Sequence, residues 1–324
     1  MANYLTPELI KVSEFGYREF IQKLPELAHL SPDISILRQD AIFEKVASVG
    51  NLSFQKEIGE IKAALANPEV GIIAADIAES SELSADENAY WGVVVALALG
   101  SNIFKPAKDE ANKTPYTVYA ASYEKSKALV DFGLDTIAPE TKLGFHTDGT
   151  INKSRVFMPY NIMLYNIVIE YKKPGNFYWV PFALWTEKKQ FMDRIGIGKR
   201  YRIKVTPSVY EFSKEKIENF SPLEIEAPIF VKNAEHDYPL YINGNVFGIC
   251  EDDAFDPAVI DALKESISQN KIRYAVPQKS RRAIFACNLK GAHARDIFEE
   301  PLYDVPYTRI FMRSVDTKTI DLNG

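Results

Sequence analysis

The residues in this sequence with the clearest chemical potential are its histidines. There are four, His29, His146, His236 and His293. His146 and Asp148 are two positions apart, and residues two apart on an extended chain point to the same side. An imidazole and a carboxylate placed in this way could hold one metal ion, and a third, distant ligand would complete a facial triad with open coordination positions. The alternative is a strand-end histidine that bonds a nearby aspartate.

The other histidines are weaker candidates. His29 lies in a Leu-rich segment with helical character, and we expect it to be structural. His236 lies in a polar turn between two strand-like segments. It is the competitor for the third ligand position, because loops can carry function when a scaffold positions them.

A second group of motifs lies downstream. Residues 286–296 read Ala-Cys-Asn-Leu-Lys-Gly-Ala-His-Ala-Arg-Asp, and residues 307–314 read Tyr-Thr-Arg-Ile-Phe-Met-Arg-Ser. Together with His-Thr-Asp at 146–148, which ends 145 residues (293 − 148) before His293, they resemble the clavaminate synthase and taurine dioxygenase-like branch of Fe(II)/2-oxoglutarate-dependent oxygenases. That branch has an HT[DE] motif, then Asn-x-x-x-x-His-x-Arg, then an Arg on the next strand. There is also some likeness to the glutarate hydroxylase subgroup.

The resemblance implies a set of site residues. His146, Asp148 and His293 would be the catalytic iron ligands, with 2-oxoglutarate and O₂ as co-substrates. Arg309 would bind the distal carboxylate of 2-oxoglutarate through a bidentate contact that Lys could not reproduce. Arg313 is four positions further along the same predicted strand and would face the same way. It could contact a substrate carboxylate or exchange roles with Arg309 in cofactor binding. The alternative for both arginines is surface salt bridges on an edge strand.

One expected contact is missing from the sequence. Members of this family often place a Thr against 2-oxoglutarate in a Gly-Gly-x-Thr context, whereas residues 174–179 read Pro-Gly-Asn-Phe-Tyr-Trp. We expect Tyr178 or Tyr165 to replace it.

The substrate is indicated only by an acidic segment, Glu251-Asp252-Asp253. Relatives that act on basic amino acids place acidic substrate contacts in this region, which implies Asp252, Asp253 and Arg313 as substrate contacts. The resemblance thus favours hydroxylation of an unactivated C–H in a small polar molecule, with a preference for a basic free amino acid. A glutarate-like diacid is the alternative. Acidic residues before a helix N-terminus also favour the helix macrodipole without any ligand. Because Asp148 is present where related halogenases carry Gly or Ala, hydroxylation or desaturation is favoured over chlorination.

The elements around these residues predict a mainly β fold with helices. Residues 85–99 follow a capping box at Ser84–Glu87, and 54–66 and 8–47 also read as helical. From about residue 116, short Val-, Ile- and aromatic-rich segments predict antiparallel strands, with 160–171 and 177–185 as a hairpin and a helical insert near 257–270. We expect a double-stranded β-helix (jelly roll) core at 116–315, a mostly helical cover at 1–115, and one oxygenase domain over 1–324. The further strands are expected at 201–206, 224–232, 238–242, 246–250, 271–276, 283–288 and 306–315, with a tight turn at 243–245.

Composition limits the function classes. The 324 residues are 46% hydrophobic and 25% charged with a net charge of −6, which disfavours a nucleic-acid partner. Cys250 and Cys287 have no metal or redox spacing, and we expect a reducing, cytoplasmic setting without secretory signal or membrane span. The partner would be a small-molecule substrate, and the oligomeric state stays open. Two rival classes remain: a metal-binding cupin-like protein without oxygenase activity, which would not need Arg309, and a non-enzymatic scaffold whose motifs are coincidental.

Overall fold

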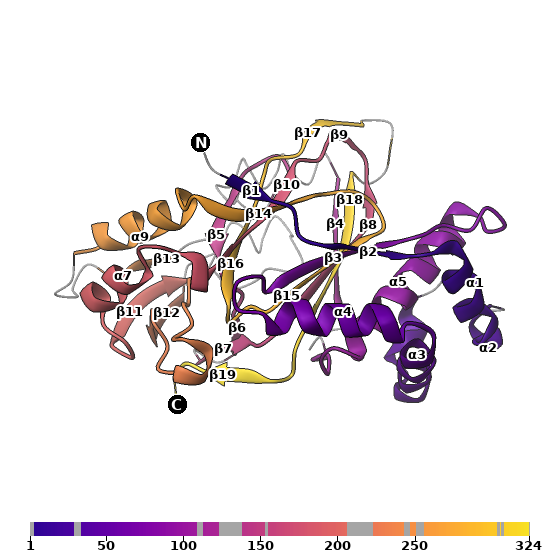
Figure 1. Cartoon of the computed structure of the whole chain (residues 1–324), viewed down its shortest axis with the longest axis horizontal. Helices are drawn as coiled ribbons and strands as arrows, with labels where there is room; N and C mark the ends of the chain where they lie inside the picture. Colours follow the sequence, from indigo (N-terminus) through magenta and orange to yellow (C-terminus); the bar gives the residue numbers. More distant parts are fainter. Residues whose placement is uncertain are drawn as a thin grey trace.

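Two facing β-sheets form the centre of the computed structural model (Figure 1). It describes residues 3–28, 34–108, 113–122, 138–152, 155–205, 223–242, 247–250, 256–302, 305 and 308–323. The five-stranded sheet has the order β1-β14-β10-β16-β5 and the six-stranded sheet the order β2-β3-β15-β8-β18-β4. The strands of the five-stranded sheet are β1 (Asn3–Leu5), β5 (Leu143–His146), β10 (Asn176–Pro181), β14 (Ile272–Pro277) and β16 (Gly291–Arg295). Those of the six-stranded sheet are β2 (Leu9–Val12), β3 (Ile72–Ile77), β4 (Thr117–Ala121), β8 (Ile162–Ile169), β15 (Arg282–Ala286) and β18 (Arg309–Val315).

Apolar side chains from both sheets meet between them. Phe177 and Trp179 of β10 lie opposite Val276 and Tyr274 of β14, and all four belong to one buried cluster. The six-stranded sheet contributes residues that alternate along β3, β8 and β15, as expected where one face of a strand is directed to a facing sheet. These residues are Ile72, Ala74, Ile162, Leu164, Ile284 and Ala286. Two facing sheets with helices outside confirm the jelly-roll prediction.

Helices cover the outer face of the six-stranded sheet. The helix α5 (Ala85–Ser101) packs on β8 and β3, and α4 (Gln55–Ala66) packs on β3 and β2. A capping box at Ser84 and Glu87 begins α5, whose apolar sequence is buried on nearly all sides. Gly92 lies where a Cβ would clash with the Tyr165 hydroxyl, so this glycine allows the helix to approach the sheet. Three further helices, α1 (Glu14–Gln22), α2 (Pro25–Ala28) and α3 (Asp40–Ser53), and the 3-10 turn η1 (Ile34–Arg38) pack on these helices or on one another.

A second group of elements lies on the opposite side of the view (Figure 1). The three-stranded sheet β12-β11-β13 is accompanied by α7 (Lys188–Ile195) and α9 (Ala258–Ser268), and α9 contacts β5. Its strands are β11 (Arg200–Val205), β12 (Leu223–Pro228) and β13 (Phe247–Ile249). Smaller pairings are formed by β6 (Thr150–Asn152), β7 (Arg155–Pro159) and β19 (Thr319–Asp321), and by β9 (Tyr171–Lys173) and β17 (Glu299–Pro301). The 3-10 turns η3 (Phe182–Leu184) and η4 (Ala234–His236) complete the described elements.

The structure corrects several sequence-based expectations. The stretch 8–47 is not continuously helical, because Leu9–Val12 forms β2 beside β3. The predicted hairpin is wrong: β8 pairs with β15 and β18, whereas β10 pairs with β14 and β16. A local turn signal could not show that the chain crosses from one sheet to the other. Residues 238–242 form only an isolated bridge, and the turn at 243–245 lies outside the described residues. No helix in the described part of the chain is long and apolar enough to cross a membrane.

Candidate metal centre

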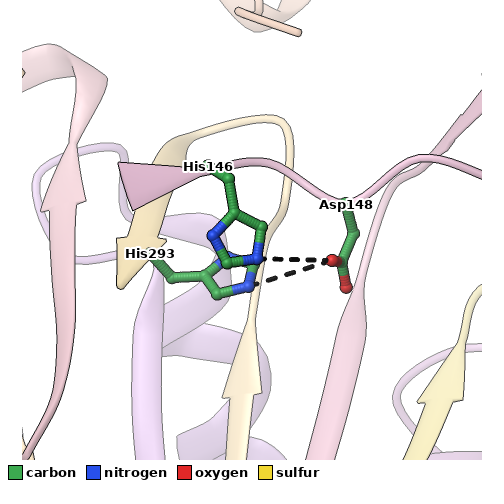
Figure 2. A group of neighbouring side chains, drawn as sticks. All are labelled: His146, Asp148 and His293. Atoms are coloured by element: carbon green, nitrogen blue, oxygen red, sulfur yellow. Dashed lines mark ion pairs between the residues drawn. The ribbon is translucent and has the colours of Figure 1, made fainter. Parts of the chain in front are cut away.

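His146, Asp148 and His293 converge at the edge of the five-stranded sheet that is formed by β16 and β5 (Figure 2). His146 is the last residue of β5, His293 is the central residue of β16, and the two are directly paired. Asp148 lies in the loop after β5. Its Oδ1 atom is 4.0 Å from Nε2 of His146 and 3.9 Å from Nε2 of His293. The potential ligand atoms of the three residues all lie within 4.8 Å of one another.

Hydrogen bonds with backbone groups fix the orientation of His146 and of Thr147, the residue between His146 and Asp148. The His146 Nδ1–H donates to the Gly144 carbonyl at 2.8 Å, which leaves Nε2 as the lone-pair nitrogen. Thr147, between them, is turned the other way, and its Oγ1 accepts from the backbone N–H of Ile242 at 3.0 Å. The predicted common side for His146 and Asp148 therefore agrees with the alternation of an extended chain.

Asn288 holds the backbone of Asp148 in place. Its Oδ1 accepts from the Asp148 N–H at 2.8 Å, and its Nδ2 donates to the carbonyls of Asp148 and Pro159 at 2.9 and 3.0 Å. Asn288 is fully buried. The sequence motif contained this residue, but no role was assigned to it. The structure gives it a positioning role.

The electrostatics suit a divalent cation. Burial lowers the pKa of His293 to about 3 and also lowers that of His146. Burial would raise the pKa of Asp148, but Arg313 and the two imidazoles outweigh it and hold this pKa at about 2. Two neutral imidazoles and one carboxylate are thus available near pH 7, a donor set used by divalent transition metals. The residues present fit an Fe(II) ion.

Arg313 lies against the carboxylate of Asp148. Its Nε donates to Asp148 Oδ2 at 3.0 Å, and its Nη2 forms an ion pair with the same oxygen at 2.9 Å, so Oδ1 is the oxygen directed to the two imidazoles. This contact supports a positioning role toward Asp148. Contacts of Arg313 with a substrate or co-substrate stay predictions.

Arg309 lies on the same face of β18 as Arg313, but its surroundings differ. Its guanidinium is buried and packs on the rings of Phe311 and Phe298, 4.1 and 4.8 Å from their centroids. Its Nη2 donates weakly to Asn166 Oδ1 at 3.2 Å and Gln278 Oε1 at 3.4 Å. Within the described part of the chain, Nε has no hydrogen-bond partner and no carboxylate pairs with the guanidinium. A buried Arg without an acidic partner is uncommon.

The other predicted site residues lie elsewhere. The His236 ring packs on Tyr160, with centroids 4.8 Å apart, and it does not join the three-residue cluster. Tyr165 and Tyr178, expected near a co-substrate, are on the outer faces of their sheets. Tyr165 lies against α5, and the Tyr178 hydroxyl donates to Asp296 at 2.8 Å. That expectation was wrong.

Three further predicted residues are not described. His29, Asp252 and Asp253 lie outside the described residues, so the acidic substrate contacts stay predictions.

Solved structures of iron-containing oxygenases are among those that share this fold. An asparagine oxygenase in complex with Fe(II), hydroxyasparagine and succinate matches at a TM-score of 0.67 and 14% identity, covering 95% of this chain and 93% of the other. The non-haem iron oxygenase OrfP matches in complex with Fe and α-ketoglutaric acid (TM-score 0.65, 13% identity) and with Fe, succinate and (3S)-hydroxy-L-Arg (0.66, 12%), covering 96% of this chain and 94% of the other in both cases. No protein-family model matches the sequence, and no curated protein is significantly similar to it. The chain therefore shares the jelly-roll fold of these oxygenases over nearly its whole length.

Proposed function

We propose that this protein is an Fe(II)- and 2-oxoglutarate-dependent hydroxylase of a free amino acid. His146, Asp148 and His293 would hold the metal, and Arg309 would bind the distal carboxylate of 2-oxoglutarate. When bound, the metal and co-substrate supply the oxidising power that places one oxygen atom of O₂ on a substrate carbon while 2-oxoglutarate becomes succinate and CO₂.

The observation that carries this proposal is the buried Arg309 guanidinium, which has no carboxylate partner among the described residues. A metal-binding cupin-like protein would use the His-Asp-His cluster but would have no reason to bury this charge. Keeping a charge out of water without a partner costs several kcal/mol. A carboxylate of a bound dicarboxylic acid would supply the missing partner through a bidentate contact.

The remaining residues position these groups. Arg313 fixes the orientation of the Asp148 carboxylate, and Asn288 fixes its backbone. Phe177 packs flat against the His293 ring, with centroids 5.3 Å apart, and restricts its rotation. The apolar cluster between the sheets, with Phe177 as a member, keeps water from one side of the site.

A basic or amide amino acid is the substrate class we propose. The structures with this fold hold hydroxyasparagine, (3S)-hydroxy-L-Arg or L-homoarginine. Asp252, Asp253 and Arg313 would be the substrate contacts. We further propose a reducing compartment such as the cytoplasm, since Cys250 and Cys287 are both free and buried.

The test is succinate formation under O₂ with Fe(II), 2-oxoglutarate and a panel of amino acids and diacids. We expect a product heavier by one oxygen atom with Asn, Arg, Lys or a close analogue. The Arg309→Ala variant should retain metal and lose succinate formation. Tight metal binding in the wild type without any affinity for 2-oxoglutarate would instead indicate the cupin-like alternative, and absence of metal binding would overturn both.

A further inference from the structure

A buried amide lies beside Arg309 with one of its donors unused. Gln278 follows β14 directly and is only 3% exposed. Its Oε1 faces Arg309 Nη2, while its Nε2 has no hydrogen-bond partner in the described part of the chain. Because a guanidinium can only donate, the amide oxygen must be the atom turned toward it. A buried N–H without a partner costs about 1–3 kcal/mol, so this amide can donate to an acceptor outside the described residues, such as a bound ligand.

The register of β14 indicates that the Gln278 side chain points to the space between the two facing sheets. Tyr274 lies opposite Trp179 and Val276 lies opposite Phe177, and these residues belong to the cluster between the sheets. Gln278 is two positions beyond Val276 and therefore points the same way. Its backbone N–H is held by the Gly175 carbonyl at 3.0 Å, which fixes where the side chain starts. Arg309 reaches it from the opposite, six-stranded sheet.

Two N–H donors without a partner among the described residues therefore lie on neighbouring side chains, and one of these side chains is positively charged. The donors are Nε of Arg309 and Nε2 of Gln278. Aromatic rings of Phe298 and Phe311 pack against the guanidinium, and its N–H groups lie in its plane, so a hydrogen-bonding ligand would approach along its edge. A planar carboxylate matches an edge-on guanidinium and has further lone pairs for a second donor.

We propose that Gln278 is the second donor to the distal carboxylate of 2-oxoglutarate and, with Arg309, selects a dicarboxylic over a monocarboxylic 2-oxo acid. This inference rests on the proposed function. The inward position 177, in the segment where relatives carry Thr, is occupied by Phe177, which packs on His293. Gln278, on the neighbouring strand, provides the hydrogen bond that Phe177 cannot.

The experiment compares two ligands of equal chain length on two proteins. Anaerobic Fe(II)-loaded wild type and Gln278→Met are titrated calorimetrically with 2-oxoglutarate and with 2-oxopentanoate, which lacks the distal carboxylate. We expect the substitution to weaken 2-oxoglutarate binding by about tenfold to a hundredfold, the range for a hydrogen bond to a charged group. Binding of 2-oxopentanoate should stay unchanged. Gln269→Met, an exposed position at the end of α9, is the matched control and should bind both ligands as the wild type does.

A second variant guards against loss of folding. Gln278→Glu places a carboxylate against Arg309, so we expect a higher melting temperature without ligand and a larger loss of 2-oxoglutarate affinity than in Gln278→Met. An equal loss for both ligands, or 2-oxoglutarate binding by Gln278→Met at wild-type strength, would overturn the role of Gln278 and leave the proposed function intact. Wild type that binds metal but not 2-oxoglutarate would overturn both.

Discussion

Replacing Arg309 by Met should stabilise the protein while removing its affinity for 2-oxoglutarate. Burial of this unpaired guanidinium costs several kcal/mol, here taken as about 5. Its two aromatic contacts and two long hydrogen bonds each return about 1 kcal/mol. The balance is a destabilisation of about 1 kcal/mol that Met, of similar length, would remove. The melting temperature of the metal-free protein should rise by about 2 °C.

The same substitution should weaken 2-oxoglutarate binding strongly. Two charge-assisted hydrogen bonds of about 1.5–3 kcal/mol each correspond to a loss of roughly a hundredfold to ten thousandfold. Differential scanning calorimetry of the metal-free protein and anaerobic titration of the Fe(II)-loaded protein measure the two effects separately. A residue that serves ligand binding at a cost in stability should show both effects when it is replaced: a higher melting temperature and weaker 2-oxoglutarate binding.

Arg295→Met is the matched control. Arg295 is also a buried arginine against Phe298, but it donates to the carbonyls of Pro139, Ala138 and Thr141 at 2.7, 2.8 and 3.1 Å. The same burial cost of about 5 kcal/mol is outweighed here by three short charge-assisted hydrogen bonds, about 1.5–3 kcal/mol each, and by one ring contact of about 1 kcal/mol, so its removal should lower stability by about 3 kcal/mol. If Arg309→Met lowers the melting temperature as Arg295→Met does, or binds 2-oxoglutarate within threefold of the wild type, the reasoning about an unpaired charge is refuted.

The remaining predictions concern the framework of the site. Asn288→Ala should weaken metal binding at least tenfold, as equilibrium dialysis would show, because the Asp148 backbone loses both of its contacts; unchanged affinity would remove the positioning role. Ser84→Ala should cost about 1 kcal/mol in urea denaturation through loss of the α5 capping box. Burial would raise the pKa of Asp76, but Arg282 and Lys279 outweigh it and hold it below its usual range. This depressed pKa stabilises the fold above the unfolded value of about 3.9, and the contribution is lost as pH falls through the folded pKa. Asp76→Asn should therefore flatten the pH dependence of stability below about pH 4, and an unchanged slope in acid titrations would argue against it.

The alternation of side chains along an extended chain was enough to predict two of the three potential metal ligands from the sequence. His146 and Asp148 share a side because they are two apart on an extended chain, and the structure has them within 4.0 Å. His293 came from the family resemblance, not from a predicted strand. Its segment, Gly-Ala-His-Ala-Arg, has small residues with weak β propensity, and β16 exists because β10 and β5 pair with it on both sides.

The misplaced tyrosines show where alternation fails. Tyr165 lies on β8, which is covered by α5 on one face and by the facing sheet on the other, so most of its residues on both faces are apolar. The sequence of such a strand does not reveal which residues point inward. Tyr178 likewise lies on the outer face of β10, where Asp296 holds its hydroxyl.

The roles of Asn288, which belongs to the motif of the family resemblance, and of Gln278 could not be predicted from local patterns. Each acts on a residue more than 30 positions away, Asn288 on Asp148 and Gln278 on Arg309. Only the pairing of distant strands brings these residues together. The predicted hairpin failed for the same reason. A turn sequence favours it locally, but β8 and β10 pair with distant strands in different sheets.

The most direct test of the central claim is an anaerobic absorption titration of the purified protein with Fe(II) and then 2-oxoglutarate. Chelation of 2-oxoglutarate by Fe(II) gives a weak visible charge-transfer band. We expect this band in the wild type, its loss in His146→Ala, and a requirement for far more 2-oxoglutarate in Arg309→Met. A wild type that binds Fe(II) but shows no band, or an Arg309→Met titration that overlays the wild type, would contradict it.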